Sequence, residues 1–250
     1  MVQLGEVTWP ELAGPRPLLV LPIGSLEQHG PHLPLDTDSR IAVAVATGLE
    51  RRLTPLLVAP VLAFGASGEH AGFPGTLSLG TDALAHAVIE IVRSADELAS
   101  GVLLVNGHGG NVVGLRRAVT VLGAEGRQVL LWTPTTALAR IAGVPAPTTA
   151  GAGDLHAGRS ETSLLLYLAP GAVRLDRATA GPTPPLAELV ARGVAALSPS
   201  GVLGDPSGAS ADEGARLLAA YVDHAAELLL AWAGRAGIPP PRPHPAPPPP

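Results

Sequence analysis

The chain has 250 residues, of which 46% are hydrophobic and 15% charged, and its formal net charge is −5. This length and apolar content suffice for one large α/β domain with a buried core. The acidic balance argues against a nucleic-acid-binding surface, which needs clustered Lys and Arg. The absence of cysteine excludes disulfides and thiolate metal sites. With no signal-peptide pattern and no apolar run of about 20 residues, we expect a cytoplasmic protein outside the membrane.

Short apolar runs alternate with longer amphipathic stretches over the first half of the chain. The runs predict strands at 18–23, 56–63, 102–106 and 128–133. The stretches between them predict helices at 39–52, 82–99 and 112–123, the first capped by Thr37 or Asp38. This alternation predicts a three-layer α/β/α sandwich with a mostly parallel central sheet. In such sheets ligands bind beyond the carboxyl ends of the strands.

The second half is less regular. Segments 64–80 and 134–155 are rich in small residues and predict loops, whereas 158–168 and 210–233 predict helices. Nearly every residue from Pro239 onward is proline, which predicts an extended or disordered tail that is dispensable unless it recruits a partner. We therefore expect a single catalytic domain over 1–237 and a Pro-rich, disordered tail over 238–250.

Polar side chains gather directly after the first predicted strand. Glu27 and His29 are two residues apart, so in an extended chain they point to the same side, and Asp38 follows at the start of a predicted helix. Carboxylate and imidazole ligands that converge on one spot suit a zinc-like or iron-like divalent ion. The alternative is a solvated loop that happens to be polar. Two further His/Glu clusters with the same placement favour the metal site.

The second cluster follows the strand at 102–106 and centres on His108, which is flanked by glycines. Glycines let the backbone approach a ligand closely, so a phosphate cradle is one alternative. However, the segment matches neither G-x-x-x-x-G-K-[ST] nor G-x-G-x-x-G. A histidine at the end of a strand fits a metal ligand better.

The third cluster contains His156, just before the predicted helix at 158–168, and Glu161 in its first turns. Glu161 could simply complement the helix dipole. The functional interpretation makes Glu161 a catalytic carboxylate and metal ligand, and His156 a catalytic acid/base.

A fourth segment, the loop after the second strand, carries Ser67, Glu69 and His70. It lacks the G-x-S-x-G order of a serine hydrolase. We expect these residues and Gly109 to line the substrate pocket, the alternative being an ordinary polar surface loop. Three other histidines are expected to be structural or exposed: His86, His224 and His244.

These motifs resemble those of the creatininase family of metal-dependent amidohydrolases, over roughly residues 18–168. They are, in order, G-S-x-E-Q-H-G-P-H-L-P-L-x-T-D, G-E-H-x-G-F-P-G-T, N-G-H-G-G-N and H-A-G-x-x-E-T-S. The resemblance implies two divalent metal ions per subunit (zinc, iron or manganese), held by Glu27, His29, Asp38 and His108, with Asp38 bridging. Creatininase has a further metal-binding Glu where this chain has Gly110, and Glu161 is the candidate replacement.

Within the family, segment 198–209 with the following Glu213-Gly214-Ala215 is most similar to the mycofactocin-system peptidase branch. That branch implies cleavage of a modified precursor peptide with release of its C-terminal Val-Tyr dipeptide. Two alternatives stay open: hydrolysis of a small cyclic or formylated amide, and a catalytically silent metal-binding module. The family also implies a homo-oligomer.

Overall fold

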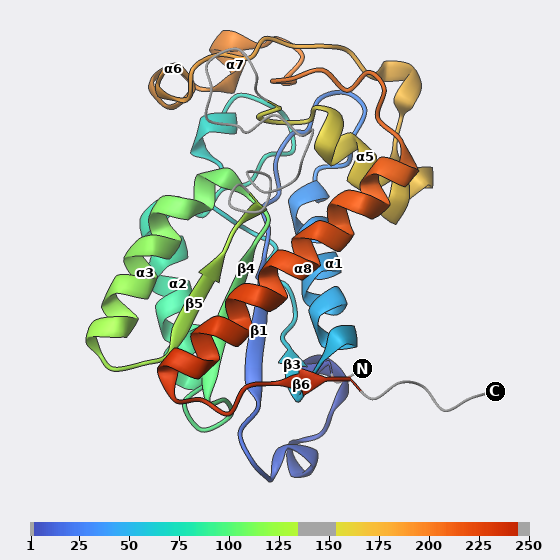
Figure 1. The fold of residues 1–250 in the computed structure, drawn as a ribbon. Coiled ribbons are helices and arrows are strands. Elements are labelled where there is room, and N and C mark those ends of the chain that lie inside the picture. Colours follow the sequence, from blue (N-terminus) through green and yellow to red (C-terminus); the bar gives the residue numbers. More distant parts are fainter. Residues whose placement is uncertain (1–2, 135–153, 245–250) are drawn as a thin grey trace, which may run out of the picture.

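A parallel sheet forms the centre of the protein (Figure 1). The computed structural model describes residues 3–134 and 154–244. The sheet has four strands in the order β3-β1-β4-β5, and every neighbouring pair is parallel. The strands are β1 (Leu18–Ile23), β3 (Leu56–Val58), β4 (Gly101–Asn106) and β5 (Val129–Trp132). All residues of β1 and β4 are buried, as continuous apolar runs in a doubly covered sheet require.

Helices cover both faces of this sheet. On one face lie α2 (Thr81–Ser94) and α3 (Val112–Ala124), and on the other lie α1 (Thr37–Arg52), α5 (Arg159–Leu168) and α8 (Ala211–Ala236) (Figure 1). Side chains alternate along β1: Leu18 and Val20 enter the core under α1 and α8, whereas Leu19 and Leu21 enter the core under α2 and α3. The predicted three-layer α/β/α sandwich is confirmed.

Two predicted elements are shorter than expected. The strand predicted at 56–63 ends at Val58, although Leu62 still donates its amide to the carbonyl oxygen of Pro22. Pro60 lacks an amide hydrogen and interrupts the ladder. The helix predicted at 82–99 ends at Ser94. Three short helical or strand elements also escaped the sequence patterns: β2 (Leu53–Thr54), α6 (Leu186–Arg192) and α7 (Val194–Leu197).

The tail begins differently from the prediction. Helix α8 ends with Gly237 in the left-handed conformation (φ 67°), as a glycine C-cap allows, but the chain then stays on the body. Ile238 is buried, and strand β6 (Arg242–Pro243) pairs antiparallel with β2. The domain boundary expected at residue 237 is therefore too early, because residues 238–244 pack and pair with the domain. Residues 245–250, and most of the loop predicted at 134–155, lie outside the described residues.

The sheet brings the polar loops together at one edge. Ile23 and Asn106, the last residues of β1 and β4, are register partners, so the loops after these two strands start side by side. Helix α1 then begins at Thr37 and carries Asp38 in its first turn, next to the same edge. Among the described residues, no helix is both long and apolar enough to cross a bilayer.

Candidate metal centre

Four acidic and imidazole side chains meet beyond the carboxyl ends of β1 and β4. Glu27 and His29 come from the loop after β1, Asp38 from α1, and His108 from the loop after β4. All four are buried, with exposed fractions of 5% or less. The sheet register explains this meeting, since parallel strands end at the same edge.

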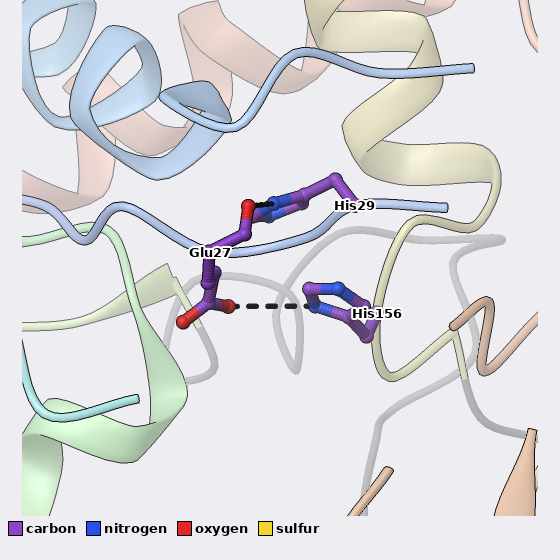
Figure 2. A group of neighbouring side chains, drawn as sticks. All are labelled: Glu27, His29 and His156. Carbon is purple, nitrogen blue, oxygen red and sulfur yellow. Dashed lines mark hydrogen bonds and ion pairs between the residues drawn. The ribbon is translucent and has the colours of Figure 1, made fainter. Parts of the chain in front are cut away.

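The start of α5 adds two more residues to this cluster. His156 is held by an isolated β-bridge to Leu203, and its amide donates to the carbonyl oxygen of Leu203 at 3.1 Å. Glu161 accepts the amide hydrogen of Ala157 at 2.6 Å, which ties its carboxylate to the turn before the helix. Figure 2 shows His156 facing Glu27 beside His29. The structure thus joins all six residues that the sequence patterns indicated as metal ligands or catalytic groups.

The described residues of the cluster form three overlapping sets of potential ligands, one of which is Glu27, His29 and His156. The other two share Asp38: Glu27, Asp38 and His108 form the set here called the His108 group, and His29, Asp38 and Glu161 form the set called the Glu161 group. Within each group the ligand atoms lie within 4.8 Å of one another. Asp38 belongs to both: its Oδ1 is 3.2 Å from His29 Nε2 and its Oδ2 is 3.3 Å from His108 Nδ1.

Backbone carbonyls orient three of the imidazoles in the same way. The bonds run from His29 Nδ1 to Glu27 O (3.1 Å), from His108 Nε2 to Ala66 O (3.1 Å) and from His156 Nε2 to Gln28 O (2.6 Å). A carbonyl oxygen can only accept, so each of these nitrogens carries a hydrogen. The opposite ring nitrogen in each case faces a carboxylate of the cluster. This arrangement is typical of histidines that bind a metal through one nitrogen and are held through the other.

The surroundings of the Glu27 carboxylate indicate whether a cation fits this site. Both of its carboxylate oxygens are completely buried and accept no hydrogen bond from the described residues. Nitrogens of His70 and His108 lie 3.2 and 3.1 Å away, but at angles that do not make hydrogen bonds. A buried carboxylate without donors is costly unless a positive charge compensates it. The residues present therefore fit a divalent cation.

Neighbouring charges and burial shift the pKa values of the cluster's histidines in opposite directions. Burial opposes the charged form of His29, but Asp38, with Glu161 and Glu27, raises the pKa of His29 to about 10. Against burial, Glu27 and Asp38 likewise raise the pKa of His108 well above its usual value. Against its own burial, the pKa of Asp38 is held low by His29 and His108. The carboxylates thus attract positive charge to the places where two cations would lie.

The pKa values of His156 and Glu161 are shifted so that the neutral form of each side chain is favoured. Burial, with His29 and His70 nearby, lowers the pKa of His156 well below its ordinary value, so its ring is neutral. Burial also raises the pKa of Glu161 to about 7, with His29 opposing and Asp38 adding to the shift. A neutral imidazole beside the carboxylates is suited to take up a proton.

The residues expected to line the pocket lie at different depths. His70 is buried, and its Nε2 is 3.2 Å from Glu27 Oε1, so it belongs to the cluster itself. Ser67 is fully buried, whereas Gly109 is exposed. Glu69 is partly exposed, and although burial opposes it, His108 lowers the pKa of Glu69. Among the other histidines, His224 is buried and accepts a hydrogen bond from Trp132 Nε1, a structural role as expected.

The family model described as "Creatininase: Creatinine amidohydrolase" matches residues 5–229. The chain belongs to the creatininase family. A mycofactocin precursor peptide peptidase of Mycobacterium ulcerans is 48% identical over 242 residues, covering 92% of this chain and 91% of that protein. The creatinine amidohydrolase of Pseudomonas putida is 35% identical over 196 residues, covering 70% of this chain and 75% of that protein. The solved structure of a mutant creatininase of "Zn-Zn type" has a TM-score of 0.77 and 30% identity, covering 95% of this chain and 98% of that one.

One residue in the centre of this creatininase-family protein was missed by the sequence analysis. The side-chain amide of Gln28 lies 2.9 Å from His70 Nδ1 and donates to Gly201 O at 3.0 Å. A Cβ at Gly201 would lie 1.9 Å from Gln28 Oε1, so the loop can pack on this amide only as glycine. The signal available in the sequence was the position of Gln28 between two predicted ligands, Glu27 and His29.

Proposed function

We propose that this protein is a two-metal peptidase that releases the C-terminal Val-Tyr dipeptide from the modified mycofactocin precursor peptide. It is a hydrolase of carbon–nitrogen bonds, as are its peptidase and amidohydrolase relatives. The observation that carries the two-metal part is Asp38, whose two carboxylate oxygens face two separate ligand groups. The peptidase relative supports the peptide substrate, since its identity extends over 92% of this chain.

The proposed ligands follow the two groups that share Asp38. Glu27, Asp38 and His108 would hold one ion, and His29, Asp38 and Glu161 would hold the other. Carboxylate and imidazole ligands suit Zn²⁺ or Fe²⁺ and accept Mn²⁺, and the structural neighbours include one titled "Zn-Zn type" and one titled "Creatininase Mn". Two ions that share a carboxylate lower the pKa of bound water toward about 7 and polarise the amide carbonyl.

His156 is the proposed catalytic acid/base. Its Nε2 hydrogen is committed to the carbonyl oxygen of Gln28, so Nδ1 is the nitrogen that can take a proton. Nδ1 lies 3.7 Å from Glu27 Oε1 and therefore faces the cluster. As the water attacks, Nδ1 accepts its proton, and it returns that proton to the amide nitrogen when the carbon–nitrogen bond breaks. The burial that keeps this ring neutral makes it ready to act first as a base.

A second candidate function is hydrolysis of a small cyclic or formylated amide. The creatinine amidohydrolase relative favours it, with lower identity and coverage than the peptidase.

The proposal also includes a location and an assembly state. A cytoplasmic location is compatible with the absence of cysteine. The proposed assembly is a homo-oligomer.

The test is mass spectrometry of the modified precursor peptide before and after incubation with metal-loaded protein. We expect a mass loss equal to Val-Tyr, and none with a His156→Ala variant that retains its metal. Hydrolysis of creatinine or a formamide without dipeptide release would support the second candidate. Absence of hydrolysis from a protein that holds two ions would support the silent module.

A further inference from the structure

Gly110 has no side chain, but the space that a side chain would enter is filled. A Cβ at this position would lie 2.1 Å from Glu69 Oε1, 2.5 Å from Ala66 O and 2.5 Å from His108 Nε2. The neighbouring Gly109 differs, because a Cβ there would meet nothing within 4 Å. No positive φ requires glycine at position 110. The lack of a side chain at Gly110 therefore leaves room for Glu69.

Glu69 reaches this space from a different part of the fold. It lies in the short 3-10 helix Gly68–His70, in the loop that follows β3, whereas Gly110 follows β4. Its Oε1 is 3.3 Å from His108 Nε2, and its side chain is 25% exposed. The carboxylate thus lies against a buried histidine of the His108 group, at the edge where the cluster reaches the surface.

The contact falls on Nε2 of His108. Nε2 donates its hydrogen to Ala66 O at 3.1 Å, and Glu69 Oε1 and Glu27 Oε2 lie 3.3 Å and 3.1 Å from the same nitrogen. Nδ1, the other ring nitrogen, is 3.3 Å from Asp38 Oδ2. A carboxylate or carbonyl on the outer nitrogen orients a metal-binding histidine and makes it a stronger ligand. Ala66 and Glu69 together provide both kinds of partner.

Glu161 does not occupy this space. Its Oε2 is 3.9 Å from His29 Nε2, and it belongs to the Glu161 group with His29 and Asp38. Besides Asp38, the His108 group contains the carboxylate of Glu27, and the Glu161 group contains the carboxylate of Glu161. On the His108 side, Glu69 is an additional carboxylate outside the three ligands of the group.

We propose that Glu69 is the positioning residue of the His108 group, and that its carboxylate beside Nε2 holds His108 Nδ1 toward the ion. This inference rests on the proposed two-metal function. It assigns Glu69 a role in ion affinity rather than the substrate contact expected from the sequence.

The test is metal titration of wild-type protein and of Glu69→Gln, which keeps the size of the side chain and removes its charge. We expect the affinity for one of the two ions to fall about 10- to 100-fold, and the affinity for the other to stay unchanged. At a chelator concentration that leaves wild type with both ions, the variant should retain one. Glu97→Gln, at an exposed position before the start of β4, is the matched control and should keep both, because the cluster lies beyond the other end of that strand.

Double variants identify the ion that is affected. Glu69→Gln combined with His108→Ala should weaken binding no further than His108→Ala alone, because both changes act on the same ion. Glu69→Gln combined with Glu161→Gln should weaken both ions, with additive effects. Melting of the metal-free variants by circular dichroism separates a role in metal binding from a role in folding.

Unchanged affinities for both ions in Glu69→Gln would overturn the inference. A fall in the melting temperature of the metal-free variant, with the same loss for both ions, would also overturn it by making Glu69 a folding residue. If wild type binds two ions but cleaves no peptide, the proposed substrate fails and the inference on Glu69 is still decided by the titration. If wild type binds no ion, both fail together.

Discussion

His156 donates its Nε2 hydrogen to the backbone carbonyl oxygen of Gln28, at 2.6 Å. This bond leaves Nδ1 as the only nitrogen of the ring that can exchange a proton, and it faces Glu27. The side-chain amide of the same Gln28 reaches His70 and the loop at Gly201. One residue between two proposed metal ligands therefore orients the proposed acid/base and ties it to a loop far along the chain.

Replacing His156 should separate proton transfer from metal binding. We expect His156→Ala to lower kcat about 10²- to 10⁴-fold, the range for loss of a general acid/base, while the metal content stays unchanged. The measurement is steady-state peptide hydrolysis beside metal analysis of the same samples. Loss of metal in proportion to activity would instead make His156 a ligand, as its proximity to Glu27 and His29 would allow.

The pH dependence of activity should reflect the lowered pKa of His156. Burial disfavours its protonated form, so the ring stays neutral below the ordinary histidine pKa of about 6.5. Activity that needs neutral His156 should persist as the pH falls through that value and decline only at lower pH. A kcat profile at saturating metal tests this expectation. A decline of kcat centred at or above the ordinary value would contradict it.

Asp38 and His108 should differ in the number of ions lost. Because Asp38 belongs to both ligand groups, Asp38→Ala should remove both ions, whereas His108→Ala should weaken only one. Activity should be abolished in both variants without unfolding. Metal analysis and circular dichroism measure the two effects. Full turnover with unchanged metal content in either variant would defeat the assignment of the metal centre.

Glu161 should influence both metal binding and the stability of the metal-free protein. Its pKa is raised to about 7, so its contribution to stability is present below the unfolded-state pKa and is lost as the pH rises through about 7. Glu161→Gln should bind metal more weakly, and its metal-free melting temperature should fall less than that of wild type between pH 5 and pH 8. Parallel melting curves for the two proteins, with equal metal content, would reduce Glu161 to a helix-capping residue.

The start of the C-terminal tail should contribute to stability, and its end should not. Truncation after His244 keeps buried Ile238 and strand β6, so the melting temperature should stay unchanged. Truncation after Gly237 removes buried Ile238 and strand β6, and should cost about 2 kcal/mol of unfolding free energy from the isoleucine alone. Ile238→Ala in the full chain is the matched control. Equal denaturation midpoints for the two truncated proteins would contradict this prediction.

A homo-oligomer should form through exposed apolar side chains of the loop at 64–80 and of the start of α3. The large exposed side chains of these two segments are Phe64 (44%), Leu77 (56%), Leu79 (43%) and Val113 (69%). Three of them belong to the loop at 64–80, and grouped exposed apolar residues favour association. Light scattering at micromolar concentration measures the mass. A fully active species of about 25 kDa, the mass of one chain, would rule the oligomer out.

The sequence by itself determined the layers and the main candidate ligands. Continuous apolar runs predicted β1 and β4 to within a residue, because a strand buried on both faces has no polar position. Since parallel strands end at a common edge, the polar residues that follow them, Glu27, His29 and His108, could be predicted to lie together from the sequence alone. These inferences depend only on local periodicity and on one rule of sheet topology.

Only the tertiary structure decided which residues from separate loops meet. Glu69 fills the space at Gly110, and Gln28 orients His156, although nothing in the local pattern of either residue indicates its partner. The pairing of β6 with β2 likewise joins segments almost 200 residues apart, so a proline-rich composition concealed it. Periodicity reports which face of an element is buried, but contacts between loops depend on how the chain closes over long distances. For this reason the meeting of the candidate ligands could be predicted, whereas the residues that orient them could not.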